Sequence, residues 1–104
     1  MAQFDVYANP NPATKRTIPF LLDIQTDLLN NLTTRVVIPL YTAAAMGKAA
    51  KHLNIQFSVK RTTVIMSTAE LAGVAVKSLG DTVCSLKEHR NEIIAAIDFL
   101  VTGF

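Results

Sequence analysis

Short apolar runs, separated by polar or proline-containing stretches, fill the first three quarters of the chain. Alternation with a period of two is typical of half-buried strands, and a compact β-branched run is typical of a more buried one. Within one such run Pro39 has no amide to donate, so a neighbour is missing there or pairing ends. The predicted strands cover residues 3–7, 18–24, 34–41, 55–59, 63–67 and 73–79.

The segments between these runs carry turn and helix signals. Two Asn-Pro pairs in residues 9–16 indicate a surface loop, because such pairs favour turns and proline removes a donor. Residues 25–31 place two leucines among polar residues and predict a turn or a short helix. A turn at residues 60–62 joins its flanking strands into a hairpin. The alanines of residues 42–53 favour a helix, which Gly47 interrupts.

The last part of the chain changes to helical spacing. This spacing predicts a long helix over residues 85–101. Its start fits an S-x-x-E capping box, in which Ser85 accepts a backbone amide and Glu88 reaches back to the cap. The apolar residues predicted to share one stripe of this helix are Ile93, Ile97, Leu100 and Phe104.

The chain finishes on Thr-Gly-Phe, an apolar tip beyond the helix. Gly103 breaks the helical pattern and leaves Phe104 as the last residue. Two interpretations of this tip remain open. Phe104 either folds back onto the core, or it belongs to an element that binds a partner.

Length and composition limit the number of domains and the fold class. The 104 residues are 50% apolar and 17% charged, and the mean hydropathy is +0.31. This length predicts one domain over residues 1–104, and the order of strands followed by a helix predicts an α+β fold with a mostly antiparallel sheet. A domain this small hides little apolar surface. Apolar residues in excess of what such a core can bury suggest a two-fold homodimer. The alternative is a monomer whose core holds them all.

Charge and cysteine content bear on which partners the protein can bind and on the cellular compartment in which we expect it. The net charge of +2 is too small to imply nucleic acid, so we expect no direct nucleic-acid binding. Cys84 is the single cysteine, so no intramolecular disulfide forms, and this fits a reducing cytosol. We find no secretory signal and no apolar run near the ~20 residues that span a bilayer. The sequence predicts a soluble, cytoplasmic protein without a membrane partner. The loosely clustered basic residues, which read best as a solvated face, are Lys48, Lys51, His52, Lys60 and Arg61.

Motifs for catalysis or cofactor binding are missing from the sequence. It has no phosphate-binding loop, dinucleotide fingerprint or H-E-x-x-H motif, and its few sulfur and nitrogen ligands argue against zinc. Asp23 and Asp27 do not indicate paired acid–base work, and His89 reads as a solvated helix residue. Arg35 is a weak signal for phosphodiester chemistry. The residues favour a binding protein with no catalytic residue, metal or cofactor.

Several segments, taken in order, resemble one known family. These are QFDVY, LLDIQTDLLNNL, TRVVIPL, GVAV and the ending HRNEIIAAIDFLVTGF. Together they resemble CcdB, the toxin of a toxin–antitoxin pair, over nearly the whole chain and more weakly over residues 41–70. The resemblance implies a homodimer of a small SH3-like barrel with a long C-terminal helix, a fold shared with the MazF and Kid ribonuclease toxins.

The resemblance also implies an activity. CcdB is not an enzyme; it binds the A subunit of DNA gyrase and traps the gyrase–DNA cleavage complex. A CcdA antitoxin neutralises it with a disordered C-terminal segment. Thr102 stands where the best-known member has tryptophan, which removes an aromatic anchor. The residues that match the gyrase contact of the family are Leu28, Leu29, Asp98, Thr102, Gly103 and Phe104.

Other departures concern the antitoxin and leave alternatives open. Lys60 and Arg61 form a basic turn where the family often carries an acidic one, so they are candidates for antitoxin binding with a shifted specificity. Ala75 replaces the usual proline of GVAV. One alternative is a MazF-like endoribonuclease, for which Arg35, Lys60 and Arg61 are the candidate cations. The other is a relative that binds antitoxin without poisoning gyrase.

Overall fold

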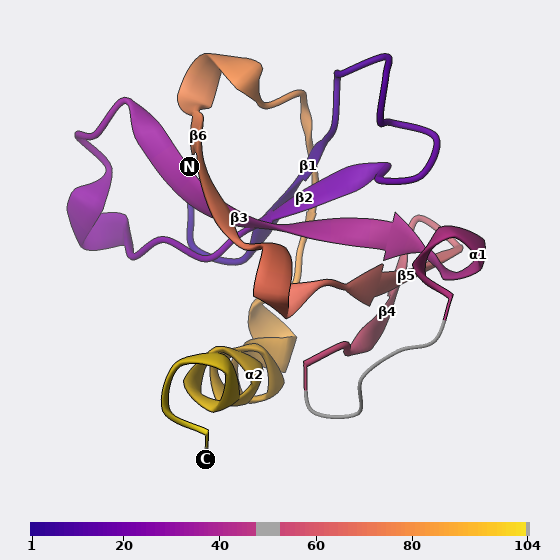
Figure 1. Ribbon diagram of the computed structural model, residues 1–104. Coiled ribbons are helices and arrows are strands. Elements are labelled where there is room, and N and C mark those ends of the chain that lie inside the picture. The colour runs from indigo at the N-terminus through magenta and orange to yellow at the C-terminus, as the bar shows by residue number, and fades with distance from the viewer. Residues whose placement is uncertain (48–52, 104) are drawn as a thin grey trace.

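A curled antiparallel sheet forms the body of the molecule, and a helix packs along one side of it (Figure 1). The computed structural model describes residues 1–47 and 53–103. The sheet contains, in the described part, β1 (Asp5–Ala8), β2 (Phe20–Asp23), β3 (Thr34–Thr42), β4 (Gln56–Val59), β5 (Thr62–Met66), β6 (Ala72–Ala75) and β7 (Thr82–Ser85). The α-helices are α1 (Ala43–Met46) and α2 (Arg90–Thr102), and the 3-10 turns are η1 (Asp27–Leu29), η2 (Thr68–Glu70), η3 (Val76–Ser78) and η4 (Lys87–His89).

β3 is the central strand, and it has three neighbours. The strand order is β4-β5-β3-β2-β1-β7, and β6 also pairs with β3. Along one edge β3 pairs with β2, while its other edge pairs first with β6, up to Val37, and then with β5, from Leu40 onward. Pro39 lies in the interval between these two partners. The prediction that a neighbour is missing at this proline, or that pairing ends there, is therefore confirmed on this edge. No ladder hydrogen bond is lost, because the proline has no strand partner on that side.

The hairpin of β4 and β5 is confirmed as predicted, with Val59 opposite Thr62. Its two central residues, Lys60 and Arg61, have positive φ angles of 47° and 65°. Both residues are left-handed, as in a type I′ turn, which suits the twist of a two-residue hairpin. Glycine, asparagine or aspartate normally occupies these positions, because other side chains strain left-handed backbone. Two long cationic side chains are therefore unusual here.

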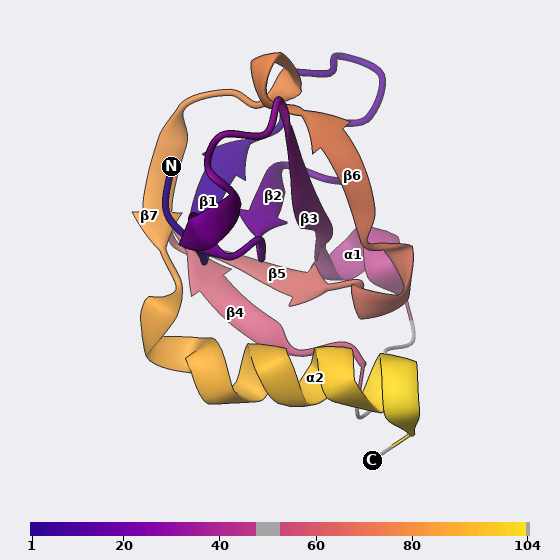
Figure 2. The same ribbon diagram turned by 90° about the vertical axis from the view of Figure 1, so that its left-hand side faces the viewer.

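The core lies between the curled sheet and α2. Figure 2 shows this helix running along one side of the sheet. On α2, Ile93 and Ala96 are buried and Ile97 packs against the same cluster. Each fully buried apolar side chain of this size contributes about 1.5–3 kcal/mol. Leu100 is 36% exposed, so the predicted stripe holds at Ile93 and Ile97 but is wrong at Leu100.

The region before α2 differs from the prediction. The strand expected over residues 73–79 ends at Ala75 and continues as η3. The strand β7, which the sequence pattern did not indicate, follows and pairs with β1. Gly80 makes this possible, because its amide bonds to the oxygen of Ala8 and a Cβ there would lie 2.6 Å from that oxygen. Only glycine allows the chain so near β1.

The predicted start of the C-terminal helix is also wrong. Ser85 closes β7, and its hydroxyl accepts from the amide of Lys87 at 3.2 Å, two residues later. The turn η4 comes next, and α2 begins at Arg90 without a side-chain cap. The capping box therefore does not form, because the Ser85 hydroxyl accepts from the amide of Lys87 and not from that of Glu88, and the first helical turn is a 3-10 turn that starts after Leu86.

Other predicted segments agree with the structure. The turn or short helix expected at residues 25–31 is confirmed as η1, and the strand after Pro19 is confirmed as β2. Within residues 42–53, α1 covers four residues and ends at Gly47; residues 48–52 lie outside the described part. The predicted α+β class, a small barrel-like antiparallel sheet with a C-terminal helix, is confirmed.

Candidate functional site

The loop around η1 presents two of the predicted site residues to solvent. Leu28 is 91% exposed and Leu29 is 46% exposed. No residue of η1 is buried, so apolar packing does not hold this turn in place. Thr26 caps it, because its hydroxyl accepts from the amide of Leu28 at 3.4 Å. The two adjacent leucines leave apolar surface on this turn open to solvent, where a partner can cover it.

A buried ion pair lies beneath this loop. Arg35 of β3 and Asp23 of β2 are 1% and 0% exposed, and Nε of Arg35 lies 2.8 Å from Oδ2 of Asp23. The other guanidinium nitrogens donate to Oδ1 of Asn30 at 2.6 Å and to the carbonyl of Gln25 at 3.0 Å. A buried charge pair persists only when its remaining groups are also hydrogen-bonded, and here they are. Among the described residues, no buried side-chain nitrogen or oxygen lacks a partner.

Sequence reasoning missed this ion pair. In the sequence, Asp23 is considered only for acid–base chemistry and Arg35 only for phosphodiester chemistry. The signal was a single charge in each of two apolar strands that follow one another in the chain, since consecutive strands often pair. The side chain of Arg35 is enclosed and its nitrogens are occupied, so it is not available to contact a substrate.

The C-terminal end of α2 presents the second group of predicted residues. Gly103 has a φ of 80°, and its amide donates to the carbonyl of Phe99 at 3.0 Å, which is the usual glycine helix end. The hydroxyl of Thr102 donates back to the carbonyl of Asp98 at 2.8 Å. Val101 is 74% exposed, although the sequence analysis did not single it out. Phe104 lies outside the described residues, so both interpretations of it stay predictions.

One subunit does not bring these two groups together. In both ribbon views η1 and the C-terminal end of α2 lie apart (Figures 1 and 2). Within one subunit, the leucines of η1 and the end of α2 therefore belong to separate surfaces. The basic turn, Lys60 and Arg61, lies on neither of these two elements.

Burial and the charge of Asp5 raise the pKa of the Cys84 thiol in β7. The charge of Lys60 opposes this rise.

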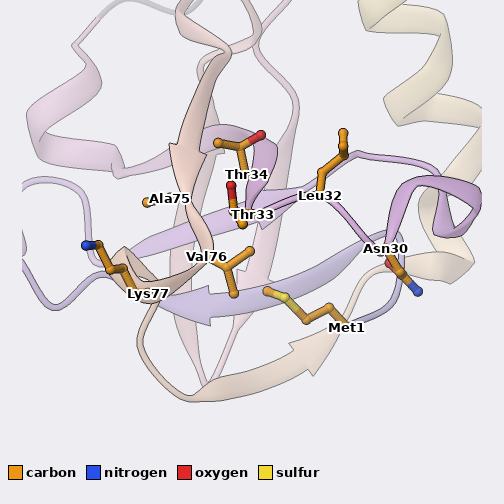
Figure 3. Close-up of a pocket in the computed structure, with 8 residues that line it drawn as sticks. All are labelled: Met1, Asn30, Leu32, Thr33, Thr34, Ala75, Val76 and Lys77. Atoms are coloured by element: carbon orange, nitrogen blue, oxygen red, sulfur yellow. The ribbon is translucent and has the colours of Figure 1, made fainter.

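A shallow hollow of about 650 Å³ opens beside η1. Figure 3 shows its lining from three segments: the N-terminus, the chain that follows η1, and the end of β6 with η3. Leu32 and Met1, both about half exposed, add apolar surface that sequence reasoning did not assign. The lining residues are Met1, Asn30, Leu32, Thr33, Thr34, Ala75, Val76 and Lys77.

Comparison with known proteins places the chain in a family. A family model described as CcdB protein matches residues 3–103, and the chain therefore belongs to the CcdB family. This membership indicates a toxin of a toxin–antitoxin system. No helix within the described residues has the length and apolar character needed to cross a membrane.

Solved structures support the fold. An endoribonuclease in complex with its cognate antitoxin, from Mycobacterial species, has a TM-score of 0.76 at 13% identity, and the match covers 97% of this chain and 94% of that one. An endoribonuclease from Mycobacterial species has a TM-score of 0.75 at 13% identity, with coverages of 97% and 90%. At this identity the likeness concerns the fold alone.

Proposed function

We propose that this protein is a gyrase poison: it binds the A subunit of DNA gyrase and stabilises the gyrase–DNA cleavage complex. The observation that carries the proposal is the 91% exposed Leu28, presented on a turn without buried residues above a buried ion pair. An exposed leucine adds nothing to folding, so its fixed presentation favours a role in binding. Membership of the CcdB family supports gyrase as the partner.

The proposal includes a two-fold homodimer. The leucines of η1 and the end of α2 are far apart in one subunit (Figure 2), and two copies related by a two-fold axis can present both groups on one face. The gyrase A dimer also has a two-fold axis, so one toxin dimer fits it symmetrically. Poisoning then requires a higher affinity for the cleaved state, since equal affinity for both states shifts nothing.

The basic turn of the β4–β5 hairpin is our candidate for antitoxin binding. Lys60 and Arg61 both adopt left-handed backbone, a conformation that Asn-Gly would adopt at lower cost. Two adjacent cations on such a turn suit an acidic partner segment. An antitoxin accompanies one of the similar structures, which is consistent with a partner of this kind.

Two other functions remain as alternatives to test. The candidate cations of the endoribonuclease alternative are Arg35, Lys60 and Arg61. Burial against Asp23 removes Arg35 from the surface, while Lys60 and Arg61 stay exposed. The second alternative is a relative that binds antitoxin but does not poison gyrase, as the absence of an aromatic residue at Thr102 suggests. RNA cleavage by the purified protein would support the former. Antitoxin binding without growth arrest would support the latter.

A cleavage assay with purified gyrase, supercoiled DNA and ATP tests the proposal. We expect the wild-type protein to produce trapped double-strand breaks. Leu28→Ser should reduce them strongly, and Leu32→Ser, an exposed leucine of the same loop outside the proposed contact, should serve as the matched control. Deletion of Gly103 and Phe104 should abolish toxicity without loss of folding. Equal activity of all four proteins would refute the assigned contact, and no breaks with wild type would refute the function.

A further inference from the structure

The loop from Ile24 to Leu32 is held by polar side chains on both sides of η1. The amide of Gln3 donates to Oδ1 of Asp27, the first residue of η1, at 2.7 Å. Before the turn, Nε2 of Gln3 donates to the carbonyl of Ile24 at 3.0 Å. These bonds tie the first half of the loop to the N-terminal segment. They fix backbone rather than the leucine side chains, which stay in solvent.

Gln25 connects the loop to the central strand. It is 7% exposed. Its Oε1 accepts from the amide of Val36 at 3.0 Å, and its Nε2 donates to the carbonyl of Leu29 at 3.1 Å. Its own amide donates to Oδ1 of Asp23 at 2.9 Å. One residue therefore links three places: its side chain bonds β3 and the last residue of η1, and its backbone bonds the buried ion pair.

Asn30 holds the other side of the turn. Its side-chain oxygen accepts from Arg35 at 2.6 Å, and its backbone amide donates to the carbonyl of Asp27 at 3.3 Å. Asn30 is itself exposed and lines the hollow beside η1 (Figure 3). Water can therefore replace its side chain at the guanidinium, and truncation here leaves no buried charge unsatisfied.

We propose that Gln25 and Asn30 are positioning residues, which order the η1 leucines before the partner arrives. This inference rests on the proposed gyrase contact. Ordering a surface loop costs conformational entropy, and a loop that is already ordered avoids that cost on binding. The network thus acts on affinity through Leu28 and Leu29, although neither amide side chain needs to touch gyrase.

Four proteins test the inference: wild type, Asn30→Ala, Asn30→Asp and Asn31→Ala. Asparagine 31 is the neighbouring exposed residue of the same type and the matched control, while aspartate at position 30 keeps an oxygen for Arg35. The measurements are affinity for purified gyrase A, amide exchange of residues 28–32, and the urea midpoint. We expect Asn30→Ala to bind about tenfold more weakly and exchange faster, at an unchanged midpoint.

The other two variants distinguish failure of this inference from failure of the proposed function. Asn30→Asp should restore slow exchange and most of the affinity, and Asn31→Ala should match wild type. Equal affinity or equal exchange of Asn30→Ala and Asn31→Ala overturns the inference while leaving the gyrase proposal intact. If wild type does not bind gyrase A, the proposed function fails, and faster exchange in Asn30→Ala alone still supports the network as the element that orders η1.

Discussion

The loop around η1 and the C-terminal end of α2 both expose apolar side chains, but the rest of the fold holds them by different means. The loop depends on hydrogen bonds and one buried ion pair, and none of its 3-10 residues is buried. The helix depends on apolar packing of Ile93, Ala96 and Ile97 against the sheet, and its last turn extends beyond that contact.

This difference has a physical consequence. Hydrogen bonds are directional and fix a loop in one geometry, whereas apolar packing is roughly proportional to area and tolerates small shifts. We therefore expect the η1 leucines to keep one orientation and to lose it abruptly when the network breaks. We expect the helix end to respond gradually to changes in its packing.

The largest expected effect comes from breaking the ion pair. Arg35→Met leaves the carboxylate of Asp23 buried without its partner, which should lower the free energy of unfolding by roughly 3–5 kcal/mol. Urea unfolding measures this loss, and Arg90→Met, an exposed arginine, is the control. The double variant Asp23→Leu, Arg35→Met has no unpaired buried charge and should be more stable than Arg35→Met. It should not regain full stability or the order of η1, because the buried amide and carbonyl of Gln25 lose their partners. A single variant as stable as the control would contradict this description of the loop.

The next effect concerns the packing of α2. Ile93→Ala removes a fully buried side chain and should cost about 2–5 kcal/mol, because it combines lost transfer energy with a cavity. Val101→Ala on the same helix should change the free energy of unfolding by less than about 0.5 kcal/mol, since Val101 is mostly exposed. The midpoints of urea unfolding compare the two. Similar losses would show that the last turn of α2 is packed.

A smaller effect is expected at the glycine that ends α2. Gly103→Ala forces a Cβ into left-handed backbone at φ 80° and should cost about 1 kcal/mol. Gly73→Ala is the control, because no heavy atom lies within 4 Å of the added Cβ and its φ is not in that region. Thermal unfolding measures the difference. If both variants melt alike, the glycine is not needed to end the helix.

The smallest effect is a pH dependence next to the ion pair. Burial, and then the charges of Asp5 and Asp23, raise the pKa of Tyr7 above 10, while Arg35 opposes the rise. The folded state therefore favours the neutral phenol, and this stabilisation is complete below pH 10 and lost as pH rises beyond it. Tyr7→Phe should flatten the alkaline fall in stability, measured by urea unfolding across that range. An unchanged profile would exclude Tyr7 as its source.

Periodicity predicted the elements whose pattern is local. The strand β3, the β4–β5 hairpin and the presence of a C-terminal helix follow from spacing and β-branched residues within one segment. The strand β7 did not, because Thr82–Ser85 is short and becomes a strand by pairing with β1 from the other end of the chain. The local pattern also made Ser85 look like a helix cap, because nothing near it in the sequence shows its pairing with β1.

The candidate site divides in a similar way. The exposed leucines of η1 could be proposed from the sequence, because apolar residues in a polar turn stand out and matched a family segment. The Asp23–Arg35 pair could not, since the charges come from two strands and only the register of β2 and β3 places them together. The partner contacts assigned to the site residues all stay predictions: Leu28, Leu29, Asp98, Thr102, Gly103 and Phe104 for gyrase, and Lys60 and Arg61 for the antitoxin.

The pairing of β1 with β7 joins two strands that lie far apart in the sequence. Asp5 lies opposite Ser85, so the outer edge of β1 is covered only after β7 has been made. Long-range pairing of this kind is slow, because chain closure must be achieved before its contacts are gained. We expect ribosome-bound chains that stop before β7 to lack the native sheet, and a partially translated toxin would then be harmless to the cell that makes it.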